Sequence, residues 1–233
     1  MYFVTGTDTD CGKTLVSSAL LYKAKGRTLG FKPIASGCEK SELGLRNSDA
    51  LSLLAASSVK LGETLKHNGK PMQLEYQHIN PYAFEPAIAP HIAAQQIDMT
   101  IEPTKLLKHI AFATSLPLDF CLIEGAGGWH LPLGGEHLLS HVVKEAKLSV
   151  ILVVGVKLGC LNHALLTQEA LVKQGVQVAG WVANCIDPNM PHLEENLQTL
   201  SNMMLGTCLG VLPYLSEATA VTAATYLTLP QSA

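Results

Sequence analysis

The amino-acid sequence predicts an α/β fold, a mostly parallel sheet with helices on both faces. Two observations carry this prediction. Short apolar runs alternate along the chain with longer segments of helical periodicity, and such alternation favours parallel strands joined by crossover helices. The apolar runs are also continuous, as is typical of strands buried on both faces. At 233 residues, the chain is expected to form one domain, residues 1–233.

Six apolar runs are predicted to be strands, because they are short, continuous and rich in valine, isoleucine and leucine. In chain order they cover residues 2–5, 28–32, 120–123, 150–154, 176–183 and 209–212. The segments between them carry apolar residues at three- and four-residue spacing, which predicts helices. These helices cover residues 14–25, 49–56, 104–114, 138–147, 162–173 and 193–203.

Residues 59–90 interrupt this alternation. The segment is polar, contains several glycines and prolines, and has no clear periodicity. We expect a long loop here, and a loop of this length in a compact domain is either functional or a surface excursion.

Composition and charge exclude several classes of protein. Sixteen Lys and Arg against 19 Asp and Glu give a formal net charge of −3, so neither a nucleic-acid partner nor an anionic membrane is expected. The longest strongly apolar run, residues 150–156, is far too short to span a bilayer. The first residues resemble no secretory signal, and the 6 cysteines form no CxxC pair. We therefore expect a cytoplasmic enzyme with reduced thiols.

The first predicted strand continues into GTDTDCGKT, residues 6–14, and then into a helix. In such a layout the backbone amides and the helix N-terminus point at a phosphate chain, Lys13 neutralises it, and the Thr14 hydroxyl reaches Mg²⁺. The match to the usual pattern is imperfect, because Thr7 occupies the first glycine position and Gly6 precedes it. The context still favours a phosphate-binding loop over an ordinary helix start.

Two further strand ends carry candidate groups. The strand ending at Ile123 is followed by Glu124 and a glycine-rich turn, where a carboxylate could hold Mg²⁺ at the carboxyl edge of the sheet. Lys32 ends the second strand, where a cation could stabilise a transferred phosphate. Asn47 or Ser48 is expected to cap the next helix, with Asp49 in its first turn. Asp49 is either a group that complements the helix dipole or a metal ligand.

Several blocks of the chain together closely resemble the dethiobiotin synthetase family, up to about Pro213. They are GTDTDCGKT, GFKPIASG, LRNSDAL, INPYAFEPAIAPH, LIEGAGGW, VILVVGVKLGCLNHALLT and AGWVAN. The resemblance implies a homodimeric, cytoplasmic enzyme with a single-domain P-loop NTPase-like fold. It also implies that 7,8-diaminononanoate, CO₂ and ATP form dethiobiotin, ADP and phosphate with Mg²⁺, through a carbamate that ATP phosphorylates.

The resemblance also implies roles for individual residues. Lys32 and Lys13 are the implied catalytic lysines, and Thr14, Asp49 and Glu124 the implied metal ligands. The substrate is expected to contact Ser36 and, from the partner chain, Gly159, Cys160, Leu161 and Asn162. The residues expected to bind ATP are Asp10, Cys11, Gly12, Lys13, Thr14, Leu15, Asp49, Glu124, Gly125, Ala126, Gly127, Asn184, Cys185, Pro213, Tyr214 and Leu215.

The chain also departs from the family pattern, and other functions are open. Residues 59–77 are longer than the usual connection, and after Pro213 an acidic nucleotide contact is missing or replaced by Glu217. A related phosphate-loop ligase or amidotransferase fits the loop equally well, but it fits the other blocks less well. Partitioning-type ATPases carry an extra lysine early in the loop, which residues 7–11 lack. Nothing favours a non-enzymatic nucleotide-binding module.

Overall fold

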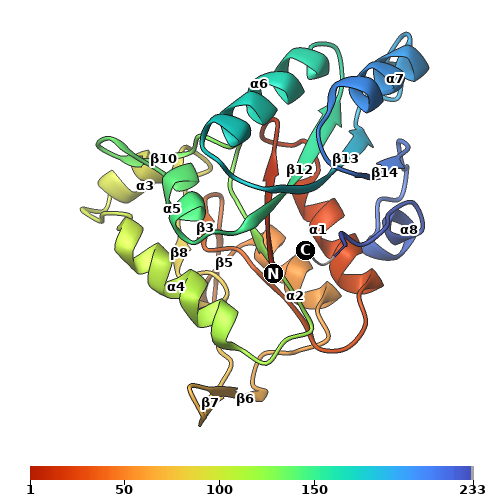
Figure 1. Ribbon diagram of the computed structural model, residues 1–233. Helices are drawn as coiled ribbons and strands as arrows, with labels where there is room; N and C mark the ends of the chain where they lie inside the picture. Colours follow the sequence, from red (N-terminus) through yellow and green to blue (C-terminus); the bar gives the residue numbers. More distant parts are fainter. Residues whose placement is uncertain (232–233) are drawn as a thin grey trace.

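A computed structural model, which describes residues 1–231, shows six parallel strands in one central sheet (Figure 1). The sheet order is β14-β13-β12-β1-β9-β2, and every neighbouring pair is parallel. All six strands were expected from the sequence, so the predicted fold class is confirmed. The strands are β1 (Tyr2–Gly6), β2 (Thr28–Phe31), β9 (Phe120–Glu124), β12 (Ser149–Val156), β13 (Val178–Cys185) and β14 (Cys208–Leu212).

Helices cover both faces of this sheet. On one face α1 (Lys13–Lys23) packs between α2 (Ser48–Ala56) and α8 (Ala220–Ala224). The other face carries α4 (Pro103–Ser115), α5 (Leu139–Glu145), α6 (Cys160–Lys173) and α7 (Leu193–Met203). Among the α-helices of residues 1–231, the sequence prediction missed the short α8 and α3 (Pro90–Gln95), which offer too few turns for a periodic pattern.

Two hydrophobic clusters form the core, one on each face of the sheet. Successive side chains of a strand alternate between them, as the pleat requires. In β1, Phe3 joins the cluster with α4 to α7, whereas Val4 joins the cluster with α1 and α8. In β12, Ile151 and Val153 face α1. This burial on both sides is why the strands read as continuous apolar runs.

Residues 59–90 are not the open loop that the sequence suggested. They form a hairpin of β6 (Thr64–His67) and β7 (Lys70–Gln73), then the 3₁₀ helix η1 (Tyr76–His78), then β8 (Tyr82–Ala83). The hairpin turn is Asn68-Gly69, both with positive φ (51° and 77°), a strong hairpin signal that the lack of periodicity concealed. Large side chains such as Leu74 and Ile79 are buried at irregular intervals along the segment. The sequence therefore shows neither the period of a strand nor that of a helix.

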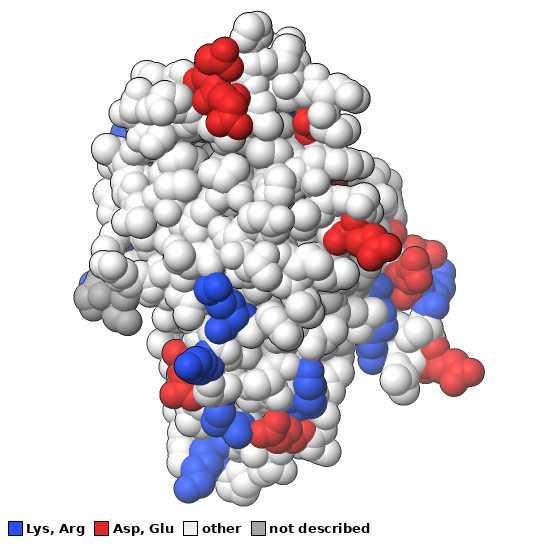
Figure 2. Space-filling view, turned by 90° about the vertical axis from the view of Figure 1, so that its right-hand side faces the viewer, with Lys and Arg blue, Asp and Glu red and all other residues white. Residues whose placement is uncertain are grey.

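Short strand pairs complete the fold at the edges of the sheet. β8 pairs with β3 (Ile34–Ala35), while two further hairpins join β4 (Glu39–Ser41) to β5 (Gly44–Arg46) and β10 (Pro132–Gly134) to β11 (His137–Leu138). Within residues 1–231 no helix is both long and apolar enough to cross a bilayer. Figure 2 shows one face of the molecule, where scattered acidic and basic side chains are separated by broad uncharged surface.

Candidate active site

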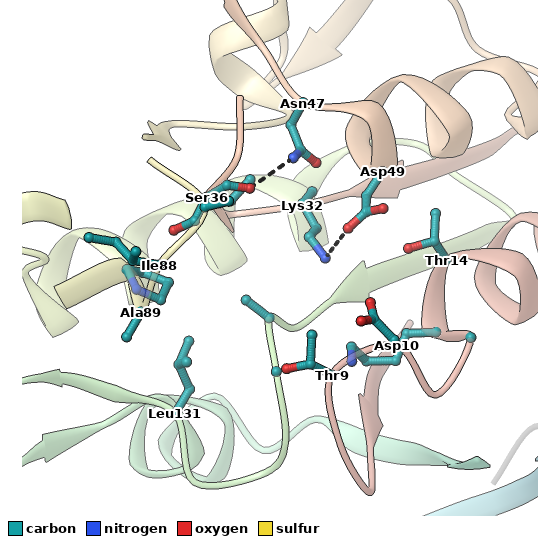
Figure 3. A pocket seen from close by; sticks show the side chains of 17 residues that line it. Thr9, Asp10, Thr14, Lys32, Ser36, Asn47, Asp49, Ile88, Ala89 and Leu131 are labelled. Atoms are coloured by element: carbon teal, nitrogen blue, oxygen red, sulfur yellow. Dashed lines mark hydrogen bonds and ion pairs between the residues drawn. The ribbon is translucent and has the colours of Figure 1, made fainter. Parts of the chain in front are cut away.

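A pocket of about 920 Å³ opens at the carboxyl edge of β1, β2 and β9 (Figure 3). Parallel strands place ligand sites at this edge, and the loops that follow them supply the polar groups. Four segments line the pocket, the loop after β1, the residues after β2 with the start of α2, the turn after β9, and the segment 87–90.

The loop after β1 has the backbone shape of a phosphate cradle. Asp10 and Gly12 take positive φ values of 56° and 90°, and α1 begins directly afterwards at Lys13. A Cβ at Gly12 would clash with the side-chain amide of Asn184. The same Asn184 amide donates to the Cys11 carbonyl at 3.0 Å. Asn184, at the end of β13, thus holds the loop in place from a strand two positions away in the sheet.

Lys13 is nearly buried, and its ammonium contacts only uncharged acceptors in the described part of the chain. Its Nζ donates to the Asp8 carbonyl at 2.9 Å and lies 3.9 Å from the Cys11 Sγ. The Asp8 carboxylate instead pairs with Lys157 at 3.2 Å, and the hydrogen bond from Lys157 holds the pKa of Asp8 below its usual value. In the described part of the chain Lys13 therefore has no carboxylate in ion-pair contact. An anion in the pocket would supply the missing charge.

Lys32 is surrounded very differently, because its ammonium lies between two carboxylates. The Lys32 Nζ is 2.7 Å from Glu124 Oε1 and 3.0 Å from Asp49 Oδ2, and it also donates to the Gly125 carbonyl at 3.1 Å. Glu124 is fully buried and Lys32 almost so. Burial alone would lower the pKa of Lys32, but the two carboxylates raise it above its usual value. Lys32 is therefore a fixed cation.

Asp49 is held in the charged form by its neighbours. Burial opposes ionisation of Asp49, but Lys32, and then the Thr14 hydroxyl, bring its pKa below the usual value. The Thr14 hydroxyl donates to Glu124 Oε1 at 2.8 Å. The other oxygen, Glu124 Oε2, is buried without a hydrogen-bond partner. An unpaired buried carboxylate oxygen beside a hydroxyl and a second carboxylate fits a hard divalent cation.

Ser36 and Asn47 form the wall next to Lys32. Ser36 lines the pocket, and its hydroxyl is buried without a hydrogen-bond partner. The Asn47 amide donates to the Ser36 carbonyl at 3.4 Å. Between the two caps considered from the sequence, the structure selects Asn47, whose side chain accepts from the Ala50 N–H at 3.2 Å.

Several residues expected to bind ATP or substrate lie outside the pocket. Cys11, Leu15 and Cys185 pack in or against the hydrophobic core, so only their backbones could face a ligand. Residues 213–215 follow β14, and none of them lines the pocket. Residues 159–162 begin α6, and they too lie outside the pocket of their own chain. Glu124 and Gly125 do not line the pocket themselves, but both accept hydrogen bonds from Lys32, which does. Ala126 and Gly127 line the pocket directly.

The sequence analysis did not identify every lining residue. Thr9, Leu131 and the segment 87–90 with Ile88 also line the pocket. Small and apolar side chains in a loop carry no chemical signal, so they could not be found without the fold. Ile88, Ala89 and Leu131 make one side of the pocket apolar, away from the charged groups at Lys32 and Asp49 (Figure 3).

Comparisons with known proteins show which family the chain belongs to. A family model described as an AAA domain matches residues 1–222. The ATP-dependent dethiobiotin synthetase of Pseudomonas aeruginosa PAO1 is 46% identical over 98% of this chain and 96% of its own length. That of Chromohalobacter salexigens is 47% identical over 100% of this chain and 99% of its own.

Solved structures show the fold alone. The MinC:MinD cell division protein complex of Aquifex aeolicus matches with a TM-score of 0.55 at 16% identity, covering 96% of this chain and 91% of the matched chain. Because that identity is low, the match supports the α/β architecture and nothing about activity. The full-length likeness in sequence is specific, and on that basis the chain belongs to the dethiobiotin synthetase family.

Proposed function

We propose that this protein is an ATP-dependent dethiobiotin synthetase, a cyclo-ligase that closes the ureido ring of dethiobiotin from 7,8-diaminononanoate and CO₂. The observation that carries the proposal is the fixed Lys32 cation in a pocket that it shares with the phosphate loop. Family membership supplies the substrates, because the relatives' name specifies ATP and dethiobiotin.

The loop residues 10–14 would bind the phosphates of ATP. The backbone amides and the start of α1 favour an anion, and Lys13 would exchange the Asp8 carbonyl for a phosphate oxygen. The base of the nucleotide would lie towards the ends of β13 and β14, near Asn184 and residues 213–215. Asn184 is well placed for this, since it already contacts the loop.

Thr14, Asp49 and Glu124 would hold Mg²⁺, because all three present oxygen atoms and Glu124 Oε2 has no other partner. When bound with ATP, the ion would neutralise part of the phosphate charge. Lys32 is shared between the same two carboxylates, so its ammonium is held beside the metal ligands and cannot swing away.

The reaction would proceed in three bond-forming steps. One substrate amine adds to CO₂ and loses a proton, which gives a carbamate. A carbamate oxygen then attacks the γ-phosphorus of ATP, and ADP leaves. Finally the second amine attacks the carbamate carbon and loses a proton, phosphate leaves with its bonding electrons, and the ring closes. Lys32 would act in the second step, where a fixed cation lowers the repulsion between the two approaching anions.

Substrate binding would use both sides of the pocket and a second chain. The apolar residues Ile88 and Leu131 suit the alkyl chain, and the unpaired Ser36 hydroxyl suits a polar group near the reacting end. The substrate carboxylate would bind residues 159–162 at the N-terminus of α6. Since these residues lie outside their own pocket, a partner chain would have to supply them, which favours a homodimer.

The shared site can be tested by mixing two inactive variants. Lys32→Gln and Asn162→Ala subunits should each lose most activity alone, through different parts of the site, but a mixed dimer would contain one intact site. We expect activity to return on mixing after dissociation and reassembly. Absence of recovery from verified mixed dimers would contradict shared sites.

The function itself is tested by measuring phosphate release with ATP, Mg²⁺, bicarbonate and 7,8-diaminononanoate, leaving out one component at a time. We expect release only when all four are present, with dethiobiotin formed in equal amount by mass spectrometry. Release that does not depend on the diamine would contradict the proposal. The 6 cysteines are all unpaired thiols, so we also propose that the enzyme works in a reducing compartment, the cytoplasm.

A further inference from the structure

A line of buried hydrogen bonds runs behind the pocket wall, through Tyr76 and Asn80, which do not line the pocket themselves. The Asn80 amide donates to the Lys32 carbonyl at 2.7 Å, and the Tyr76 hydroxyl donates to Asn80 Oδ1 at 3.2 Å. The same Tyr76 hydroxyl accepts the Asn47 backbone N–H at 2.8 Å. Tyr76 therefore joins the end of β2 to the start of α2.

This line closes into a ring through the ion pair described above. Asn47 caps α2, and Asp49 in the first turn of that helix contacts the Lys32 ammonium at 3.0 Å. The backbone of Lys32 and the helix that carries Asp49 are thus both fixed relative to Tyr76. In this arrangement the distance between the Lys32 ammonium and the Asp49 carboxylate depends on the Tyr76 side chain, which contacts neither of them.

The ring is shielded from water. Tyr76, Asn80 and Asn47 are 7%, 3% and 4% exposed, so their polar groups must be satisfied by other groups of the protein rather than by water. The Arg46 guanidinium lies 4.1 Å above the Tyr76 ring and covers it from outside. Burial raises the pKa of the Tyr76 phenol, so the hydroxyl keeps its proton and can donate to Asn80 while accepting from Asn47.

We propose that Tyr76 is a positioning residue for catalysis, which sets the placement of Lys32 against Asp49 by bridging Asn80 to the N-terminus of α2. The proposal rests on the proposed function of Lys32 and Asp49. It also gives the irregular segment 74–80 a role, because the 3₁₀ helix η1 places the Tyr76 hydroxyl between the two elements.

Tyr76→Phe removes the bridging hydroxyl and keeps the buried ring. Two buried polar groups then lose their partner, and the ion pair can relax, so we expect kcat to fall about ten-fold. The KM for ATP should change little, because Lys13 and the phosphate loop are not part of the ring. The apparent affinity for Mg²⁺ should weaken, since Asp49 is displaced.

Tyr82→Phe is the matched control. Tyr82 is similarly buried in the same segment, but its hydroxyl accepts from the Glu102 N–H at 3.1 Å, away from the pocket. We expect this variant to lose stability without losing kcat. Urea unfolding of both variants separates folding from catalysis. Asn80→Ala breaks the next link of the ring, and it replaces Tyr76→Phe if that variant folds poorly.

A double variant shows whether Tyr76 acts through Lys32. Combined with Lys32→Gln, Tyr76→Phe should lower kcat far less than it does alone, because the group that it positions is gone. A full additional ten-fold loss would overturn the proposal, as would a folded Tyr76→Phe enzyme with the kcat of Tyr82→Phe. If Lys32→Gln alone retained activity, the proposed function of Lys32 would fail instead.

Discussion

The two lysines that line the described pocket, Lys13 in the phosphate loop and Lys32 at the end of β2, lie in opposite surroundings. Lys13 contacts a backbone carbonyl and a distant sulfur, whereas Lys32 contacts two carboxylates and a carbonyl. Lys13 thus has charge available for a ligand, while the charge of Lys32 is already balanced. The wall at Lys13 can therefore bind an anion. The wall at Lys32 already has its charged groups paired in the absence of a ligand.

The difference follows from how the two walls are built. The phosphate-loop wall is one continuous segment, and its charge partner would be the ligand itself. The Lys32 wall gathers groups from β2, β9 and α2, with Lys32 and Glu124 separated by 92 positions in the chain. A preorganised group of this kind is suited to stabilise charge as it develops in a transition state. We therefore expect Lys32 to act mainly in the chemical step and Lys13 mainly in ATP binding.

The largest expected effect is that of Lys32→Gln on turnover. Removing one preorganised charge partner commonly lowers kcat by about 10²–10³, and ATP affinity should fall far less because the phosphate loop is intact. The variant also leaves Glu124 buried beside a neutral group, which destabilises a fold by about 3–5 kcal/mol. Steady-state kinetics, ATP titration and urea unfolding would measure all three quantities.

Lys105→Gln is a suitable control for this prediction, because Lys105 pairs only with exposed Glu102 on α4. It should leave turnover and stability almost unchanged. A near-normal kcat in Lys32→Gln, or a loss of ATP affinity in proportion to activity, would contradict the proposal that Lys32 acts in the chemical step rather than in ATP binding.

Lys13→Gln should mainly weaken ATP binding and should change the stability of the fold little. A hydrogen bond to a charged group contributes about 1.5–3 kcal/mol, so the Kd for ATP should rise by about 10- to 100-fold. Stability should change little, since Lys13 forms no ion pair in the described structure. Isothermal titration with a non-hydrolysable ATP analogue would give the Kd. A variant that unfolds easily but binds ATP normally would show that Lys13 has a structural role.

Glu124→Gln tests the metal site proposed at the Lys32 wall. The amide oxygen can still accept from Thr14 and Lys32, so the fold should persist, but the orphaned Oε2 is lost as a cation ligand. We expect the apparent affinity for Mg²⁺ to weaken by about ten-fold, and Thr14→Val to act in the same direction. Turnover would be measured across a Mg²⁺ titration. Unchanged turnover at limiting Mg²⁺ in both variants would contradict the proposed site.

The smallest effect concerns the pH dependence of stability. The pKa of Asp49 is lowered in the folded protein, so its contribution is complete above the unfolded value of about 3.9. As the pH falls below that value, the unfolded chain binds a proton that folded Asp49 resists, and the contribution is lost. The stability difference between wild type and Asp49→Asn should therefore shrink as the pH falls below about 4.

Glu136→Gln, at an exposed loop position, is the control, and its difference from wild type should stay small throughout. Urea unfolding at a series of pH values would measure both. A difference for Asp49→Asn that is constant from neutral to acid pH would show that Asp49 gains nothing from Lys32.

Several features could not be recognised from local patterns. The hairpin 64–73 contains an Asn-Gly turn, yet its strands bury so few side chains that no period-2 pattern results. Tyr76 and Asn80 are polar or aromatic residues in an irregular segment, and only their contacts across the fold show what they join. Ile88 and Leu131 likewise enter the pocket only because tertiary packing places their loops there.

The sequence by itself determined the six-stranded α/β architecture and the phosphate loop, because both depend on local features. Burial on both faces makes central strands such as β1 and β12 continuous apolar runs, and a loop of nine consecutive residues needs no distant partner to be recognised. Only the tertiary structure decided how Lys32, Asp49 and Glu124 are paired. Their separation in the chain says nothing of distance, and the order of strands in the sheet brings the three charges together.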